Sequence, residues 1–242
     1  TCRDWSSDVC SSDLCSSGPV TGAGDSNECI GGLVGKQSGG TINISFSTGD
    51  VVGKSKLGGL VGAQEQYMYF VEGDAFVSNC YAMGDVVGND GGSYIGGLVG
   101  YQCMDMGKAV IINSYSAGHV TGGDNSSYVG GFAGYSEETV LNCFWDVEAS
   151  EQPASAAGEG KTTPEMKVLS LYMKAGWDIL GETQNGTEDY WAINSNVNAG
   201  YPYLITKSLT QGDGTPENPY QISTPEELIM LGNDSSLWDK CF

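Results

Sequence analysis

The chain has 242 residues, of which 30 are acidic and 10 basic, and its formal net charge of −20 would repel the phosphates of a nucleic acid. Arg3 is the only arginine, so the guanidinium groups that read bases and clamp phosphates are almost absent. The 37 glycines follow no three-residue period, which excludes collagen and indicates many tight turns. No apolar run approaches the roughly 20 residues that cross a bilayer. We therefore expect neither a nucleic-acid partner nor a membrane span.

Residues 1–14 differ in sequence pattern from the rest of the chain. The stretch from Asp4 to Leu14 (DWSSDVCSSDL) resembles the conceptual translation of a sequencing-library adapter, and it shows no hydrophobic period. We expect residues 1–14 to be an artefact or a disordered tail that packs against nothing. We therefore base no functional argument on them.

Internal repetition dominates residues 15–150. A Gly-Gly-Leu-Val-Gly phrase occurs three times and is followed by one degraded copy, at spacings of 27, 38 and 34 residues. Its repeat-defining glycines are Gly31, Gly32, Gly35, Gly58, Gly59, Gly62, Gly96, Gly97, Gly100, Gly130, Gly131 and Gly134. A second phrase follows each copy and begins at Ile42, Val77, Ile111 and Val140. Two phrases that recur in a fixed order predict a repeat architecture.

The repeats predict β-strands stacked coil upon coil. Short β-prone runs lie between glycine pairs, and none has the i, i+3, i+4 spacing of a helical face. Each run is too short to form a stable sheet alone, but it can pair with its own copy in the next repeat, with the inward residues forming one core. We predict an all-β fold, a right-handed β-helix (a β-solenoid) of about four coils with one repeat per coil.

Aligned repeats give columns of equivalent side chains, which we expect in register at about 4.8 Å per coil. The aromatic column contains Phe46, Tyr81, Tyr115 and Phe144. A leucine column contains Leu33, Leu60, Leu98 and Phe132. A turn column that favours a ladder of hydrogen bonds contains Ile44, Asn79, Asn113 and Asn142. Cys80 and Cys143 share a column with Ser45 and Ser114, so we expect both thiols to be buried, free and too far apart for a disulfide.

The two phrases resemble the GLUG-motif repeats of bacterial surface proteins over roughly residues 15–150. Members of that family are large secreted or cell-surface proteins, including adhesin-like proteins and non-catalytic regions of some surface peptidases. The resemblance implies a repeat fold and an extracellular or cell-surface location. It supplies no active site.

Residues 151–206 predict a cap. Thr163-Pro164-Glu165 has the pattern of a helix start with Thr163 as the N-cap. The apolar side chains expected in this cap are Met166, Leu169, Met173, Leu180, Trp177, Trp191, Tyr201 and Tyr203. We expect the helix and these aromatics to cover the exposed end of the last coil. Residues 207–242 read as a linker and the truncated start of a following unit, with a short strand at 214–222 and a second helix after Thr224.

The residue types favour neither catalysis nor zinc binding. His119 is the only histidine, and it shares a column with Asp50 and Asp85, which favours a solvated turn over a ligand. Without a histidine partner, serine or cysteine triads are excluded, and we name no catalytic residue, no cofactor and no metal ligand. Two alternatives stay open: calcium at the acidic turns, and an acid-only carbohydrate-active groove.

Insertions between repeats are the most suggestive binding features. One insertion carries Tyr67, Tyr69 and Phe70, and another carries Tyr101 and Met104; such loops often form a binding face, although they can also cover only themselves. We expect a structural or adhesive module that binds a glycan or a surface protein of a host or neighbouring cell, and not an enzyme. The alternative is the non-catalytic region of a surface peptidase or a polysaccharide-degrading enzyme.

Overall fold

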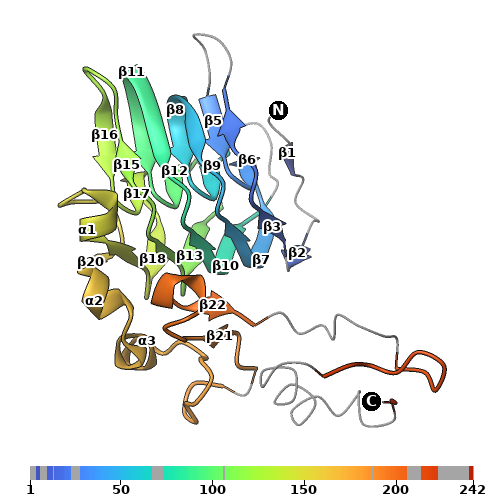
Figure 1. Cartoon of the computed structure of the whole chain (residues 1–242). Coiled ribbons are helices and arrows are strands. Elements are labelled where there is room, and N and C mark those ends of the chain that lie inside the picture. Colours follow the sequence, from blue (N-terminus) through green and yellow to red (C-terminus); the bar gives the residue numbers. More distant parts are fainter. Residues whose placement is uncertain are drawn as a thin grey trace.

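The computed structural model describes residues 4–5, 10–12, 14–22, 28–66, 73–105, 107–186, 188–205, 214–222 and 240–241. The described residues up to Lys161 form a β-solenoid of about three turns, with parallel strands stacked along one axis (Figure 1). Each coil passes through three faces in the order B, C, A.

The strands of each face pair in parallel with their copies in the neighbouring coils. Face A contains β1 (Asp4–Trp5), β6 (Val34–Gln37), β9 (Val61–Gln66), β12 (Val99–Met104) and β17 (Ala133–Ser136). Face B contains β2 (Cys10–Ser12), β3 (Cys15–Ser16), β7 (Gly40–Ser47), β10 (Ala75–Ala82), β13 (Ala109–Ile112), β14 (Tyr115–Ser116), β18 (Thr139–Leu141), β19 (Phe144–Asp146) and β20 (Glu159–Lys161). Face C contains β4 (Val20–Thr21), β5 (Glu28–Gly31), β8 (Val51–Gly58), β11 (Val86–Gly96), β15 (Val120–Thr121) and β16 (Ser127–Gly130).

The register confirms one repeat per coil. Tyr81 pairs with Phe46 on one side and with Tyr115 on the other, and Tyr115 pairs with Phe144. The rings of Phe46, Tyr81 and Tyr115 are stacked at centroid distances of 4.8 and 5.2 Å, close to the spacing between paired strands. The leucine column is also in register, because the N–H groups of Leu33, Leu60 and Leu98 each donate to the next member of that column.

The repeat glycines serve close approach between chains rather than left-handed backbone. A Cβ on Gly97 would lie 2.2 Å from the carbonyl oxygen of Gly131, and a Cβ on Gly100 would lie 2.5 Å from the amide nitrogen of Leu57. The left-handed positions that recur from coil to coil have other residues, with φ between 48° and 62°: Cys29, Ile44, Lys56, Asn79, Tyr94, Asn113, Tyr128 and Asn142. The sequence-based expectation that the glycines mark turns therefore misses their main role, which is to let neighbouring chains touch.

The asparagine column forms part of the predicted turn ladder. Asn79 Nδ2 donates to Asn43 Oδ1 at 3.2 Å, and Asn142 Nδ2 donates to Asn113 Oδ1 at 3.3 Å. Asparagine tolerates the left-handed region better than other side chains, so one residue both turns the strand and links two coils.

The C-terminal segment starts with short helices and ends in a small hairpin. Its elements are α1 (Val147–Ser150), α2 (Thr163–Met166), α3 (Leu169–Ala175), the 3-10 helix η1 (Asn198–Gly200), and the antiparallel strands β21 (Trp191–Ala192) and β22 (Tyr203–Leu204). The single helix predicted from Thr163 is two short helices. The N-cap is Thr162, whose backbone N–H and hydroxyl both donate to the Glu165 carboxylate, at 2.8 and 2.7 Å.

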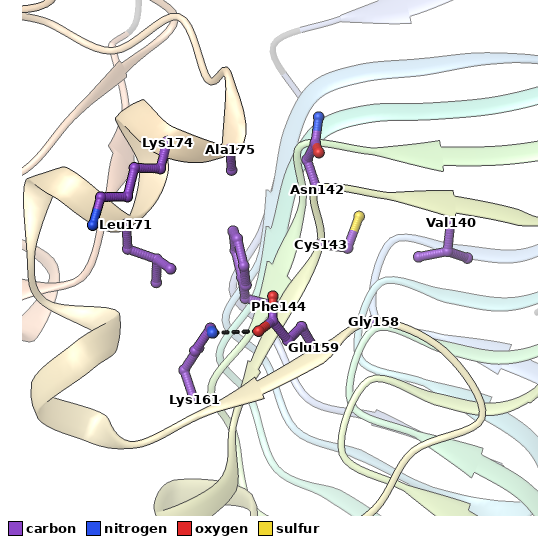
Figure 2. A pocket seen from close by; sticks show the side chains of 10 residues that line it. All are labelled: Val140, Asn142, Cys143, Phe144, Gly158, Glu159, Lys161, Leu171, Lys174 and Ala175. Carbon is purple, nitrogen blue, oxygen red and sulfur yellow. Dashed lines mark hydrogen bonds and ion pairs between the residues drawn. The ribbon is translucent and has the colours of Figure 1, made fainter.

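The helices and aromatics of residues 163–204 lie along the side of face B, so their predicted place over the end of the last coil is wrong, whereas residues 154–161 of the predicted cap do pack on that coil. Trp191 Nε1 donates to Asn79 Oδ1 at 3.3 Å, and Trp177 Nε1 donates to the Asn142 carbonyl at 2.9 Å. Figure 2 shows Leu171 of α3 facing Phe144 of β19. The aromatic column points outward from face B, and covering it removes a continuous strip of apolar surface from water.

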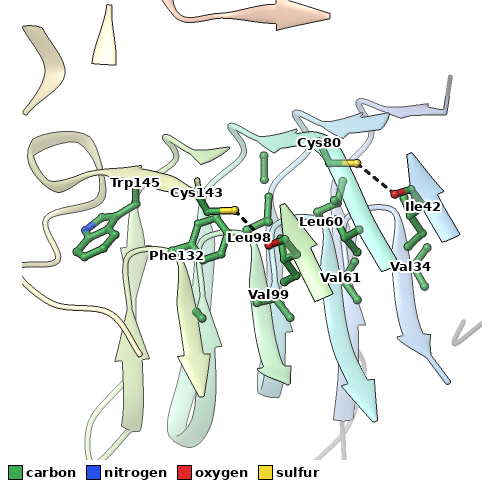
Figure 3. Packing of buried hydrophobic residues seen from close by; sticks show 14 residues of the cluster. Val34, Ile42, Leu60, Val61, Cys80, Leu98, Val99, Phe132, Cys143 and Trp145 are labelled. Carbon is green, nitrogen blue, oxygen red and sulfur yellow. Dashed lines mark hydrogen bonds between the residues drawn. The ribbon is translucent and has the colours of Figure 1, made fainter. Parts of the chain in front are cut away.

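Trp145 closes the end of the solenoid interior instead (Figure 3). The interior is built from valine and leucine columns, and the last full coil contributes Phe132 to it. The indole of Trp145 lies against Gly131, where a Cβ would come within 2.1 Å of the ring, and its Nε1 donates to the Gln152 carbonyl at 3.2 Å. The end of the core was therefore already sealed, which left the aromatics of residues 163–204 free to pack on face B.

The two ends of the chain also differ from expectation. In the described part of residues 1–14, β1 pairs with β6 and β2 pairs with β7, so the expectation that this stretch packs against nothing is wrong. The outer edge of a coil presents free N–H and C=O groups, and this pairing uses only backbone atoms, which any sequence supplies. Residues 214–222 form bends rather than the expected strand, and the helix predicted after Thr224 lies outside the described residues.

Candidate functional site

Four tyrosines form a cluster on the outer corner between faces C and A, which we call the tyrosine platform. Tyr94 and Tyr128 come from β11 and β16 of face C, and Tyr101 and Tyr135 come from β12 and β17 of face A. Tyr101 pairs directly with Tyr135 in the ladder, and the residues on either side of Tyr94 pair with those flanking Tyr128. The platform therefore spans two successive coils, with two tyrosines in each.

The local backbone places this platform at the surface. Tyr94 and Tyr128 have φ values of 62° and 56°, so each occupies a left-handed position just before a residue of the interior. Ile95 is fully buried, whereas Tyr94 is half-buried and Tyr128 is 56 % exposed. Cys29 and Lys56, the equivalent residues of the preceding coils, have the same left-handed backbone, so this turn is a feature of the repeat.

The four rings contact one another. Tyr94 and Tyr128 are stacked with centroids 4.9 Å apart and planes within 15°, and Tyr101 and Tyr135 are stacked at 5.2 Å and 10°. The two stacks meet edge to face, with Tyr94 at 5.0 Å from Tyr101 and Tyr128 at 5.9 Å from Tyr135. Nearly parallel rings at these centroid distances are offset, since rings stacked face on would lie closer. Each ring thus covers only part of the face of its neighbour.

Charged groups flank the platform. At one side, Lys56 Nζ lies 4.9 Å from the centroid of the Tyr101 ring and forms an ion pair with Glu65 at 2.6 Å. At the other side, the Glu137 carboxylate accepts hydrogen bonds from the Tyr135 hydroxyl and, at 3.4 Å, from the Cys103 thiol. The rim therefore offers hydrogen-bonding groups at both ends of an aromatic surface.

The hydrogen bond between Tyr135 and Glu137 shifts both groups. It raises the pKa of Tyr135 to about 12 and lowers the pKa of Glu137, because it stabilises the neutral phenol beside an ionised carboxylate. The pKa of Tyr101 is also raised, first by burial and then by its hydrogen bond to Cys103. At neutral pH both phenols keep their protons; the Tyr135 hydroxyl donates its proton to Glu137, so its oxygen can only accept a hydrogen bond from a ligand.

Of the predicted loop residues that the structure describes, Tyr101 lies in this platform and Met104 does not. Tyr101 belongs to it, but β12 continues through Met104, so the predicted loop at Tyr101–Lys108 starts later than expected. Met104 is buried against Ala75 and Ala109 and is not a surface residue, because β12 extends its pairing with β9 as far as Gln66. The predicted loop residues Tyr67, Tyr69 and Phe70 lie outside the described residues.

Three platform residues were missed from the sequence, although a signal was present. Tyr94 and Tyr128 each precede the Gly-Gly pair by two residues, and Tyr101 and Tyr135 each follow the last glycine of the phrase directly. Two tyrosines at the same two offsets in consecutive repeats predict a cluster once one repeat per coil is accepted. Length variation between repeats points to the insertions, whereas the platform comes from this regular pair.

A pocket of about 480 Å³ lies between face B and the cap (Figure 2). It is lined by Val140, Asn142, Cys143, Phe144, Gly158, Glu159, Lys161, Leu171, Lys174 and Ala175. Lys161 forms an ion pair with Glu159 at 2.5 Å across one wall. The pocket is a seam between the solenoid and α3, with a mixed polar and apolar lining.

His119 occupies a turn ladder. Its N–H donates to Asp85 Oδ1 at 3.0 Å, and the N–H of Asp85 donates to Asp50 Oδ1 at the same distance. Its ring lies 3.5 Å from the Glu151 carboxylate. Among the residues that the structure describes, no three histidine, cysteine or acidic side chains gather in a way that could hold a metal ion, and no helix could span a membrane.

Comparison with known proteins provides no relative for this site, since no family model, no curated protein and no solved structure matches the chain. The chemistry of the platform therefore has to be derived from its own side chains.

Proposed function

We propose that this chain is a structural or adhesive β-solenoid module of a secreted or cell-surface bacterial protein, which binds a partner and does not catalyse a reaction. One contrast supports binding. The outer surface carries two groups of aromatic side chains in register, and the cap covers only the one on face B. In the tyrosine platform, Tyr128 is 56 % exposed and the other three tyrosines are partly exposed.

The exposed part of the tyrosine platform supports a role in binding. Tyr128 is more than half exposed, although the same chain buries Tyr81 and Tyr115 under the cap. Contiguous exposed apolar surface on a soluble protein marks an interaction site more often than single exposed residues do. Tyrosine is also favoured in binding surfaces, because it offers a large, rigid contact area with a polar end.

The location is supported by the sequence. The GLUG-like phrases resemble those of secreted and surface proteins, and the strongly acidic composition suits a protein that must stay soluble at a cell surface. A stack of coils places binding residues at fixed intervals on a rigid support, which is the arrangement that an adhesive or display module requires.

Cell binding by the full chain tests the proposal. We expect the fluorescently labelled protein to bind saturably to at least one class of intact bacterial or host cell, and the unlabelled protein to compete. A double variant, Tyr94→Asn and Tyr128→Asn, should lose most of this binding, because it removes one stack of the platform. Asparagine suits the left-handed backbone at both positions, so the fold should persist.

Leu141→Ser is the matched control. Leu141 is 54 % exposed on β18, outside the platform, and its replacement should leave cell binding unchanged. Equal binding by the wild type and the double variant, or release of sugars from a panel of polysaccharides by the wild type, would contradict the proposal.

A further inference from the structure

We infer that the tyrosine platform is a binding subsite for an uncharged glycan, in which one sugar ring lies on the exposed Tyr128 and the neighbouring units contact the edges of the other three tyrosines. The inference rests on the proposed binding function and names its ligand class. A pyranose ring has a face of C–H groups and a rim of hydroxyls. The negative face of an aromatic ring attracts such C–H groups, while the phenol hydroxyls at the ring edges can hydrogen bond to the rim.

The spacing of the platform fits a chain of sugars. Stacked tyrosines repeat at 4.9 Å in one column and 5.2 Å in the other, along the axis of the solenoid. Successive coils are about 4.8 Å apart, and one hexose unit in an extended β-linked glycan advances by about the same distance. Because paired rings cover much of each other's faces, a glycan along the axis can stack one sugar on Tyr128, which is 56 % exposed, and contact the edges and hydroxyls of the neighbouring tyrosines.

The flanking groups provide polar contacts of the right kind. The Glu137 carboxylate holds the Tyr135 hydroxyl and the Cys103 thiol, and an ionised carboxylate can also accept hydrogen bonds from sugar hydroxyls. The lowered pKa of Glu137 keeps it ionised well below neutral pH. Protein sites that read sugars need such oriented acceptors beside an apolar surface.

The charge around the platform favours a neutral ligand. Glu137 lies at one side, and the Lys56 ammonium at the other side is already paired with Glu65. The whole chain carries a net charge of −20, which would oppose phosphate, sulfate or uronate groups. Among ligands that stack on tyrosines, these charges disfavour nucleic acids and acidic polysaccharides.

The size of the platform favours a glycan over a folded protein. Four tyrosines in two coils make a small surface, whereas a stable protein interface buries about 800 Å² on each partner. A short oligosaccharide needs only a few well-placed aromatic contacts, and the two stacks supply them without a conformational change.

Glycan binding by the full chain, measured first on a glycan array and then by calorimetry, tests the inference. We expect binding to neutral hexose or N-acetylhexosamine oligosaccharides, with affinity that rises from the monosaccharide to the tetrasaccharide and then levels off. Tyr128→Asn should weaken the affinity for the tetrasaccharide about tenfold, as the loss of one stacking ring predicts. Tyr128→Phe keeps the ring and should bind more tightly than Tyr128→Asn.

Leu141→Ser is again the matched surface control, and thermal unfolding of each variant separates loss of the site from loss of the fold. If folded Tyr128→Asn binds the same glycans as tightly as the wild type, the platform is not the subsite. If no glycan binds, but the wild type attaches to cells through a protein in a Tyr128-dependent way, the ligand class is wrong and the proposed function stands. If the wild type binds neither glycans nor cells, both fail.

Discussion

Each coil turns its face-B strand at a single left-handed residue, and the third of these residues gives a clean test of the turn. Asn113 has a φ of 48° and accepts a hydrogen bond from Asn142 Nδ2. Asn113→Ala should lower the free energy of unfolding by about 1–2 kcal/mol, because alanine is strained in this region and cannot bond to the next coil. In Asn113→Gly the backbone strain is absent but the hydrogen bond to Asn142 is still lost. The free energy of unfolding should therefore fall by less than in Asn113→Ala.

Urea unfolding of the two Asn113 variants separates backbone strain from the ladder. Equal losses for alanine and glycine would assign the effect to the side-chain hydrogen bond alone, and no loss for either would remove both explanations.

Gly97 tests the role of close approach. In Gly97→Ala the new Cβ would lie 2.2 Å from the Gly131 carbonyl oxygen and 3.0 Å from the Ser116 side chain, so two coils would have to separate. We expect a loss of at least about 3 kcal/mol, or failure to fold. Gly18→Ala is the control, because a Cβ there meets nothing within 4 Å. It should change stability by less than about 0.5 kcal/mol in the same chemical denaturation.

The cysteine column behaves as predicted from the sequence, with buried free thiols at Cys80 and Cys143. Each thiol donates to the carbonyl two residues earlier, as the hydroxyls of Ser45 and Ser114 do, and Figure 3 shows both sulfurs inside the stack. Burial raises the pKa of Cys80 to about 12 and raises that of Cys143 as well, so neither thiolate forms near neutral pH.

In the native protein, Cys80 and Cys143 should therefore resist a thiol reagent at mildly alkaline pH, whereas the exposed Cys15 should react. Cys80→Ser should cost only about 1 kcal/mol, because neighbouring coils already accept a hydroxyl at this place. Peptide mapping after labelling checks both statements. Rapid native labelling of Cys80, or a Cys80–Cys143 crosslink, would contradict them.

At the scale of elements, the contact between the cap and face B is sensitive to high pH. Burial raises the pKa of Tyr81 to about 12 and raises the pKa values of Tyr115, Tyr172 and Tyr201, which all lie in this contact. In the unfolded chain these phenols lose their protons near pH 10. Their contribution to stability is therefore complete below about pH 10 and is lost as the pH rises through about 12.

We expect the cap to detach from face B in that pH range. The near-ultraviolet circular dichroism of Trp177 and Trp191, which lie in the same contact, should fall together with the appearance of the phenolate absorbance. If the phenols titrate in one step near pH 10 while the tryptophan signal stays intact, these tyrosines are not desolvated by the cap.

The elements show where sequence reasoning succeeds and where it stops. The register of Phe46, Tyr81 and Tyr115 could be predicted, because identical repeats that pair in parallel must place equal positions side by side. The side of the solenoid on which the cap lies could not be predicted. Trp177 and Trp191 could pack against any apolar strip, and the sequence does not show which strip they cover. Only the outward direction of the aromatic column and the closure by Trp145 decide it.

The candidate site follows the same division. Tyr101 was noticed for its place in an apparent insertion, and it belongs to the platform because β12 is longer than the sequence indicated. Tyr94 and Tyr128 recur at one offset in consecutive repeats, which predicts that they are neighbours, but their outward direction depends on a left-handed backbone position that a tyrosine does not indicate. A turn made by glycine or asparagine would have been recognised.

At the scale of the whole molecule, coils of a solenoid contact mainly their neighbours, so that such stacks can open one coil at a time. The cap changes this pattern. It bonds to Asn79 in one coil, to Tyr115 in the next and to Asn142 in the coil after that. Three successive coils are thereby held to one external segment and should unfold together.

That lateral attachment has a mechanical meaning. A load that peels the stack open at one end breaks the hydrogen bonds of a single coil at a time, as a zipper does. With the cap in place, the same load must also shear Trp177 and Trp191 away from two different coils at once. The C-terminal segment therefore supports several coils from the side. A module that holds a cell to a surface under flow would gain resistance to force where a plain stack of coils is weakest.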